Sequence, residues 1–127
     1  MLTLVKMGFT IMAEKTKSSL LARLALVPRT LEARGLDASP AIRNRLVSVG
    51  DHRGAAILDI ILRDEIGHVA VGNRWYRYLC SAHHLDPIST FAELAAQYRA
   101  PKLKGPFNLA ARRAAGFDEA ELAVLGS

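Results

Sequence analysis

The chain has 127 residues and a mass of 13.8 kDa, which is enough for one folded domain and too little for two. Half of the residues are apolar and 23% are charged, so the composition excludes a disordered or collagen-like chain. The single Cys80 excludes an intramolecular disulfide and metal sites built from several thiolates. Seventeen Lys and Arg against twelve Asp and Glu give a net charge of +5. The basic residues are scattered, which favours a solvated surface over a nucleic-acid-binding patch.

Residues 1–12 are mildly apolar but are interrupted by Thr3, Lys6, Gly8 and Thr10. This segment is too short to span a bilayer, and it lacks the continuous apolar run of a secretory signal. We therefore expect an irregular lead over residues 1–12, a folded domain over residues 13–127, and a cytoplasmic protein without membrane contact.

The first helical pattern of apolar residues runs from about residue 13 to residue 34, with Gly35 placed to cap its C-terminus. Pro28 lies inside this pattern and predicts a kink or a break, because proline removes one backbone hydrogen bond and crowds the preceding turn. Ser39-Pro40 predicts the start of a second helix that ends near Val49, with serine as the N-cap and proline at the first helical position.

The longest predicted helix covers residues 51–80 and contains no proline. A further helix is expected over residues 86–99, opened by an Asp-Pro pair, and Asn108 and Asp118 are placed to cap two short helices. No segment shows the period-2 alternation of a strand. The sequence thus predicts an all-α fold.

Two residues of the long helix, Glu65 and His68, are candidate metal ligands. At about 100° per residue, Glu65 and His68 share the apolar stripe that contains Leu62, Val69 and Gly72, so we expect both side chains to be buried. A buried carboxylate needs a partner or a metal ion. Glu-x-x-His is the ligand pair of di-iron and di-manganese carboxylate bundles, which use it on two helices together with one further Glu from each of the other two. Glycine at position 72 either lets helices approach closely or clears space for a cofactor.

Glu32 is the candidate for the single Glu, because it shares a helix face with Leu21 and Ala25. A site made of Glu32, Glu65 and His68 suits iron or manganese, since carboxylate oxygens and imidazole nitrogens are ligands for both. In such a site, one carboxylate that bridges two metal ions would serve as a ligand to both.

A metal-free interpretation stands beside this one. In it Glu65 pairs with a core arginine, Arg29 or Arg63, and His68 is a hydrogen-bonded core histidine. The run from Cys80 to His84 contains one cysteine and two histidines, but it lies at a helix end without a second ligand pair. We interpret this run as structural or solvated.

Four segments together cover most of the chain and carry a resemblance to a known family; they are LARLALVPRTLEARGLD (21–37), RDEIGHVAVGNRWYRYLC (63–80), LDPISTFAELAAQY (85–98) and GPFNLAARRAAGF (105–117). In this order they closely resemble the C-terminal half of an uncharacterised bacterial ferritin-like family. The resemblance implies a ferritin-like helical bundle, here the C-terminal helix pair followed by short C-terminal helices. It also implies that Glu32, Glu65 and His68 match metal ligands of the family.

Family members carry an earlier helix pair with its own Glu and Glu-x-x-His, and residues 1–12 are too short to hold one. Either the chain is a truncated remnant that binds metal poorly, or two copies pair to rebuild one dinuclear iron or manganese site, as encapsulated ferritins do between protomers. We therefore expect a homodimer, or a partner that supplies the missing half, with an oxidoreductase or iron-handling role and no defined substrate.

The alternative from another functional class is a metal-free helical module whose basic surface contacts RNA or an acidic partner. One ferritin-like branch combines both properties, because it hydroxylates a modified base in transfer RNA. No RNA-binding motif is present in the sequence, so nucleic-acid contact is only an alternative here.

Overall fold

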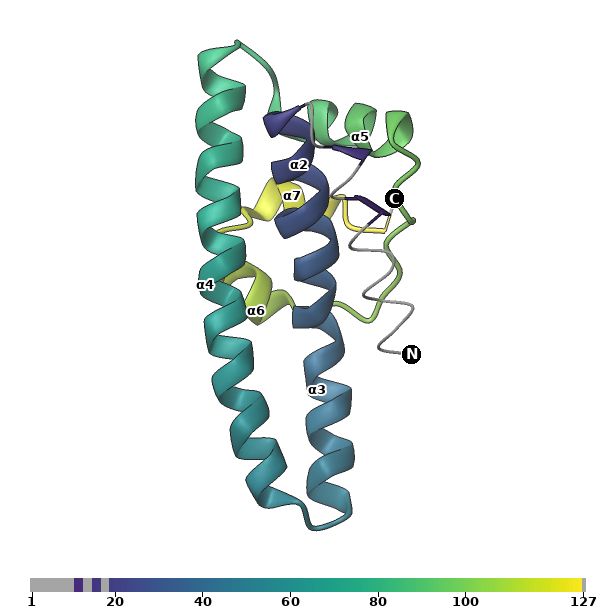
Figure 1. Ribbon diagram of the computed structural model, residues 1–127, viewed down its shortest axis with the longest axis vertical. Helices are drawn as coiled ribbons and strands as arrows, with labels where there is room; N and C mark the ends of the chain where they lie inside the picture. The colour runs from purple at the N-terminus through teal and green to yellow at the C-terminus, as the bar shows by residue number, and fades with distance from the viewer. Residues whose placement is uncertain (1–10, 13–14, 17–18, 127) are drawn as a thin grey trace.

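The computed structural model describes residues 11–12, 15–16 and 19–126, and this part of the chain is all-helical, as predicted. A long helix, α4, runs antiparallel to a second rod made of α2, η1 and α3, while α5 lies across one end and the short α6 and α7 pack beside the pair (Figure 1). Within the described residues no helix combines the length and the apolar composition needed to cross a membrane. Most of the expected N-terminal lead, and the start of the first predicted helix, lie outside the described residues.

The first rod contains a π-helical segment at its proline. Helix α2 (Leu20–Leu26) leads into the π-helix η1 (Val27–Glu32), which continues directly into α3 (Ala33–Ser48). Pro28 lacks an N–H and its ring crowds the preceding turn, and the wider π turn accommodates both effects. The Thr30 hydroxyl also donates to the Ala25 carbonyl at 2.9 Å. The irregularity predicted at Pro28 is therefore a π turn within one continuous rod.

The prediction that one helix ends at Gly35 and another begins at Ser39 is wrong, because α3 continues through Pro40. Ser39 is not an N-cap here: its hydroxyl donates to the Gly35 carbonyl at 2.8 Å. Pro40 cannot donate to the Leu36 carbonyl one turn earlier, and Asn108 Nδ2 supplies that hydrogen bond instead, at 3.1 Å. Asn108, which lies 72 positions after Leu36, thus supplies the hydrogen bond that the interior proline cannot donate.

The other helices begin where they were predicted, three of them at the predicted caps Asp86, Asn108 and Asp118. Asp51 accepts from the Gly54 amide at 2.8 Å and opens α4, and Asp86, Asn108 and Asp118 cap the later helices in the same way. The bounds are α4 (His52–Ala82), α5 (Pro87–Gln97), α6 (Leu109–Ala114) and α7 (Glu119–Ala123). The predictions for the long helix and the three C-terminal helices are confirmed.

The core consists of two clusters along α4. One lies against α3 and the C-terminal segment and includes Leu36, Val69 and Phe117; the other lies against α2 and includes Leu26 and Tyr76. Between the two clusters, η1 lies in close contact with α4. Both clusters lie on the side of α4 that faces the rest of the chain, which leaves another side of α4 without cover.

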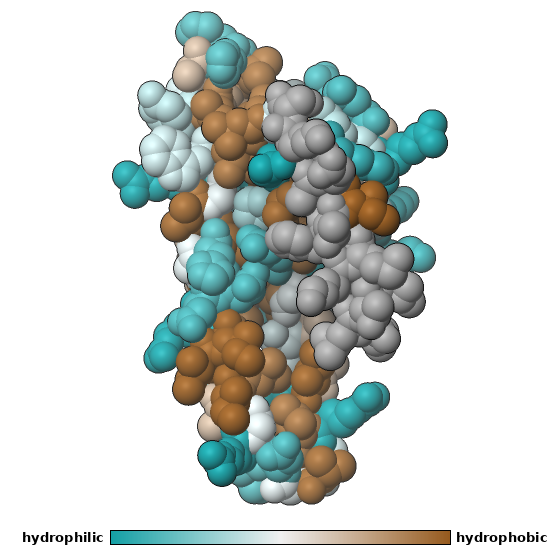
Figure 2. All heavy atoms as spheres, viewed as in Figure 1, coloured by the Kyte–Doolittle hydropathy of each residue, from teal (hydrophilic) through white to brown (hydrophobic). Residues whose placement is uncertain are grey.

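The uncovered side of α4 is apolar. Ile57, Ile61, Val71 and Trp75 are all at least half exposed, and at 3.6 residues per turn they fall on one face together with His68. We call these five residues the uncovered stripe. Figure 2 shows hydrophobic side chains gathered over the connected ends of α3 and α4 on the face in view. Exposed apolar surface of this extent is typical of an interaction site.

Candidate functional site

Glu32 is the last residue of the π turn. Wide turns of this kind inside helices are frequent at functional sites, because they re-aim the side chains that follow. Burial raises the pKa of the Glu32 carboxyl, the neighbouring Glu65 raises it further, and His68 acts in the opposite direction. Glu65 and His68 are therefore close enough to act electrostatically on the Glu32 carboxyl, although Glu32 belongs to another helix.

Glu65 and His68 lie one turn apart on α4. His68 Nδ1 is 3.7 Å from Glu65 Oε2, but the side chains differ in exposure, at 28% for Glu65 and 68% for His68. The prediction that both are buried is thus wrong for His68, which lies on the uncovered stripe. Periodicity identifies an apolar face, but it does not reveal whether anything in the same chain covers that face.

Two carboxylates converge at this place without a basic partner. Among the described residues no Lys or Arg forms an ion pair with Glu32 or Glu65, and Arg29, the suggested partner of Glu65, pairs with Glu121 instead. A cation held between the carboxylates would relieve their repulsion. In chemistry and charge, the donor set of two carboxylates and one imidazole fits iron or manganese.

The cluster is nevertheless not a complete metal site in one chain. In the part of the chain that the structure describes, no three His, Cys, Asp or Glu side chains form a group that could hold a metal ion. Glu32, Glu65 and His68 therefore do not form such a group by themselves. At the far end of α4, Cys80 is buried, and burial raises the pKa of its thiol, while His83 and His84 are exposed.

The sequence analysis missed a buried arginine cluster centred on Glu121. The Glu121 carboxylate pairs with both Arg29 and Arg77, and Arg29 Nε donates to Asn73 Oδ1. The Arg29 guanidinium carbon also lies 4.2 Å from the centroid of the Tyr76 ring. Burial lowers the pKa of Arg29, and Glu121 opposes that effect. The sequence predicted only that Asp118 caps a short helix, because the arginines that pair with Glu121 are distant in sequence and leave no local signal.

A second buried arginine ties the C-terminal helices to α3. Arg112 is fully buried and donates to Asp37 through Nε at 2.9 Å and through Nη2 at 2.6 Å, the two-pronged geometry of a strong arginine–carboxylate pair. Arg112 belongs to α6, whose cap Asn108 also contacts α3, so the short C-terminal helices are fixed by polar contacts as well as by packing.

The comparisons with known proteins place the chain in a family. The model of a family described as "Protein of unknown function (DUF455)" matches residues 4–123. An uncharacterised protein of Haemophilus influenzae is 48% identical over 115 residues, which are 91% of this chain and 40% of the relative. No solved structure matches the chain. The chain therefore spans about 40% of the length of this relative, and it belongs to the DUF455 family.

Proposed function

We propose that this chain is half of a ferritin-like di-metal protein in which Glu32, Glu65 and His68 supply half of a dinuclear iron or manganese site. The observation that carries the proposal is the position of the cluster: two carboxylates from two helices, neither paired with a lysine or arginine among the described residues, beside a histidine that lies in the middle of the uncovered stripe. A helix pair packed on that stripe would bury the apolar side chains and complete the ligand set in one step.

We propose a second copy of the chain as the source of that helix pair when the chain is alone. An isologous dimer presents the same patch from both protomers, so that two sets of the three ligands face one another. In a longer relative an additional segment of the same chain could take this place, since this chain matches 40% of the relative's length. Within the proposed site Glu32 and Glu65 would hold the metal through their carboxylates, and His68 would hold it through its imidazole. The bound metals would supply oxygen-dependent oxidation or iron handling.

The experiment is to measure mass in solution and metal content of the same sample. Chain purified with ferrous iron or manganese is analysed by light scattering and elemental analysis, and we expect a dimer with about one metal ion per chain. Glu65→Gln and His68→Ala should lose the metal and remain folded by circular dichroism. Glu93→Gln, which removes an exposed carboxylate from α5, is the matched control and should retain it. A metal-free monomer, or equal metal content in all variants, contradicts the proposal.

The metal-free, nucleic-acid-binding alternative has less support, because many of the arginines already have carboxylate partners. Besides Arg29, Arg77 and Arg112, two exposed arginines are paired: Arg43 with Asp59 and Arg113 with Glu119. Paired arginines contribute little to a phosphate-binding surface. Binding of a transfer RNA that weakens steeply with added salt would favour this alternative, since phosphate contacts release counterions.

A further inference from the structure

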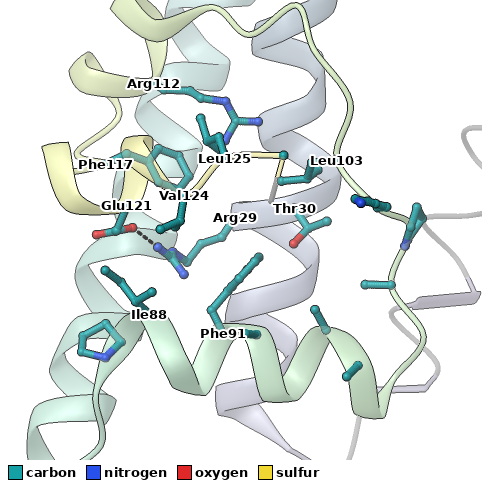
Figure 3. Close-up of a pocket in the computed structure, with 18 residues that line it drawn as sticks. Arg29, Thr30, Ile88, Phe91, Leu103, Arg112, Phe117, Glu121, Val124 and Leu125 are labelled. Atoms are coloured by element: carbon teal, nitrogen blue, oxygen red, sulfur yellow. Dashed lines mark hydrogen bonds and ion pairs between the residues drawn. The ribbon is translucent and has the colours of Figure 1, made fainter.

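A cavity of about 680 Å³ lies between η1, α5 and the C-terminal segment, and none of the three proposed metal ligands lines it. This volume is within the usual range for small-molecule sites. Figure 3 shows Ile88 and Phe91 of α5 on one side, and Phe117, Val124 and Leu125 of the C-terminal segment on the other. The walls are therefore mostly aliphatic and aromatic.

Besides Thr30, Lys102 and Glu121, two buried arginines interrupt this mostly apolar wall. The Arg29 side chain is 4% exposed and Arg112 is fully buried, and each keeps an Nη1 without a hydrogen-bond partner although its other nitrogens are engaged. Both guanidinium carbons lie 5.2 Å from the centroid of the Phe117 ring, and both arginines line the cavity. A buried donor without an acceptor is unfavourable, and an anionic oxygen is the acceptor that arginine binds most strongly.

The charges around the cavity leave one positive charge in excess. Arg29 and Arg77 are paired with Glu121 and Asp118, Arg112 is balanced by Asp37, and Lys102, which also lines the cavity, adds the remaining positive charge. This balance suits a ligand with a single negative charge. A ligand with two negative charges would exceed this single excess positive charge.

We propose that this cavity binds a monocarboxylate with an apolar body, of the class of medium-chain fatty acids. The carboxylate is directed toward the unpartnered nitrogens of Arg29 and Arg112, and the hydrocarbon chain lies along Phe91, Ala92 and Leu125. This site is independent of the proposed metal function, because it shares no residue with it.

The head group is tested on the unmodified chain by calorimetric titration. Decanoate, used below its micelle-forming concentration, should bind with one site per chain. Octanoate, which is two methylenes shorter, should bind roughly 15-fold more weakly, because each methylene buried in an apolar site contributes about fourfold in affinity. Decan-1-ol should bind at least tenfold more weakly than decanoate, and decyltrimethylammonium should show no saturable binding. Equal binding of the acid and the alcohol would overturn the proposed role of the arginines.

The location is tested with two tryptophan variants of the same helix. Ala92 is exposed and lines the cavity, so Ala92→Trp fills the cavity without removing a core side chain; Gln97 is exposed on α5 and does not line it. Thermal unfolding first establishes that both variants fold. Ala92→Trp should weaken decanoate binding at least tenfold, and Gln97→Trp should leave it unchanged. If decanoate binds equally well to Ala92→Trp, it binds elsewhere, for example on the uncovered stripe, and the cavity is not the site.

Discussion

Pro28 of the π turn lies directly against Gly72 of α4. A Cβ atom built at position 72 would be 2.5 Å from Pro28 Cβ and 2.6 Å from Pro28 Cγ, distances that real side chains essentially never adopt. The space beside Gly72 is therefore filled by the proline ring and is not free for a cofactor. This contact also fixes the distance between η1 and α4, and hence where Glu32 lies relative to Glu65.

The close contact predicts opposite effects for two glycines of the same helix. Gly72→Ala should lower the free energy of unfolding by about 1–3 kcal/mol, because overpacking at the proline outweighs the better helix propensity of alanine. At Gly67 no atom lies within 4 Å of a new Cβ, so Gly67→Ala should raise the free energy of unfolding by up to about 1 kcal/mol. Urea unfolding of both variants measures the difference. Equal effects at the two positions would show that the rods separate easily at η1.

The buried arginine cluster predicts a strong dependence on one carboxylate. Glu121→Gln leaves the buried Arg29 without a negative partner and leaves Arg77 only with Asp118, at 4.0 Å, so it should lower the free energy of unfolding by about 3–5 kcal/mol. Glu119→Gln, two residues earlier on the same helix, breaks only an exposed pair with Arg113 and should change stability little. Chemical unfolding of the two variants checks this contrast, and a mild effect at Glu121 would mean that water reaches the cluster.

Glu32 predicts a pH-dependent effect whose sign follows from its raised pKa. Because the folded chain holds the Glu32 pKa above the ordinary value of 4.5, ionisation of Glu32 at neutral pH opposes folding, and this penalty disappears as the pH falls below that range. Without added metal, Glu32→Gln should therefore be more stable than the parent at pH 7, and the two should converge near pH 4. Urea unfolding at both pH values tests this, with Glu93→Gln as the control. A parent that is more stable than Glu32→Gln at pH 7 without metal would contradict the burial argument.

The uncovered stripe predicts where a dimer would break. Ile61 is 55% exposed on that stripe, so Ile61→Glu should convert the proposed dimer into monomers without loss of helix content. Ala56→Glu introduces the same side chain on another face of α4 and should leave the mass unchanged. Light scattering distinguishes the outcomes, and a dimer that survives Ile61→Glu would place the interface elsewhere.

The helices were predictable from sequence where their signals are local. Asp51, Asp86 and Asp118 each cap a helix through an amide three residues on, a spacing that the sequence displays directly. Exposure was not predictable: the stripe around His68 has the same periodicity whether or not another chain covers it. The pair between Arg29 and Glu121 spans 92 positions and leaves no local pattern at all.

The wrongly predicted break at Ser39-Pro40 leads to a last prediction, since the helix survives there through a distant side chain. Asn108→Ala removes the donor to the Leu36 carbonyl, which Pro40 cannot replace. In Pro40→Ala the new backbone N–H can serve that carbonyl, so the same Asn108→Ala change should lower the free energy of unfolding by about 1 kcal/mol less than in the parent. A double-mutant cycle measures this coupling in urea. Asn108→Ala also removes the cap in which Asn108 accepts from the Ala111 amide. The free energy lost with that cap is the same in both backgrounds and cancels in the cycle. Strictly additive effects would mean that Asn108 acts on α6 alone, and that α3 tolerates Pro40 without its help.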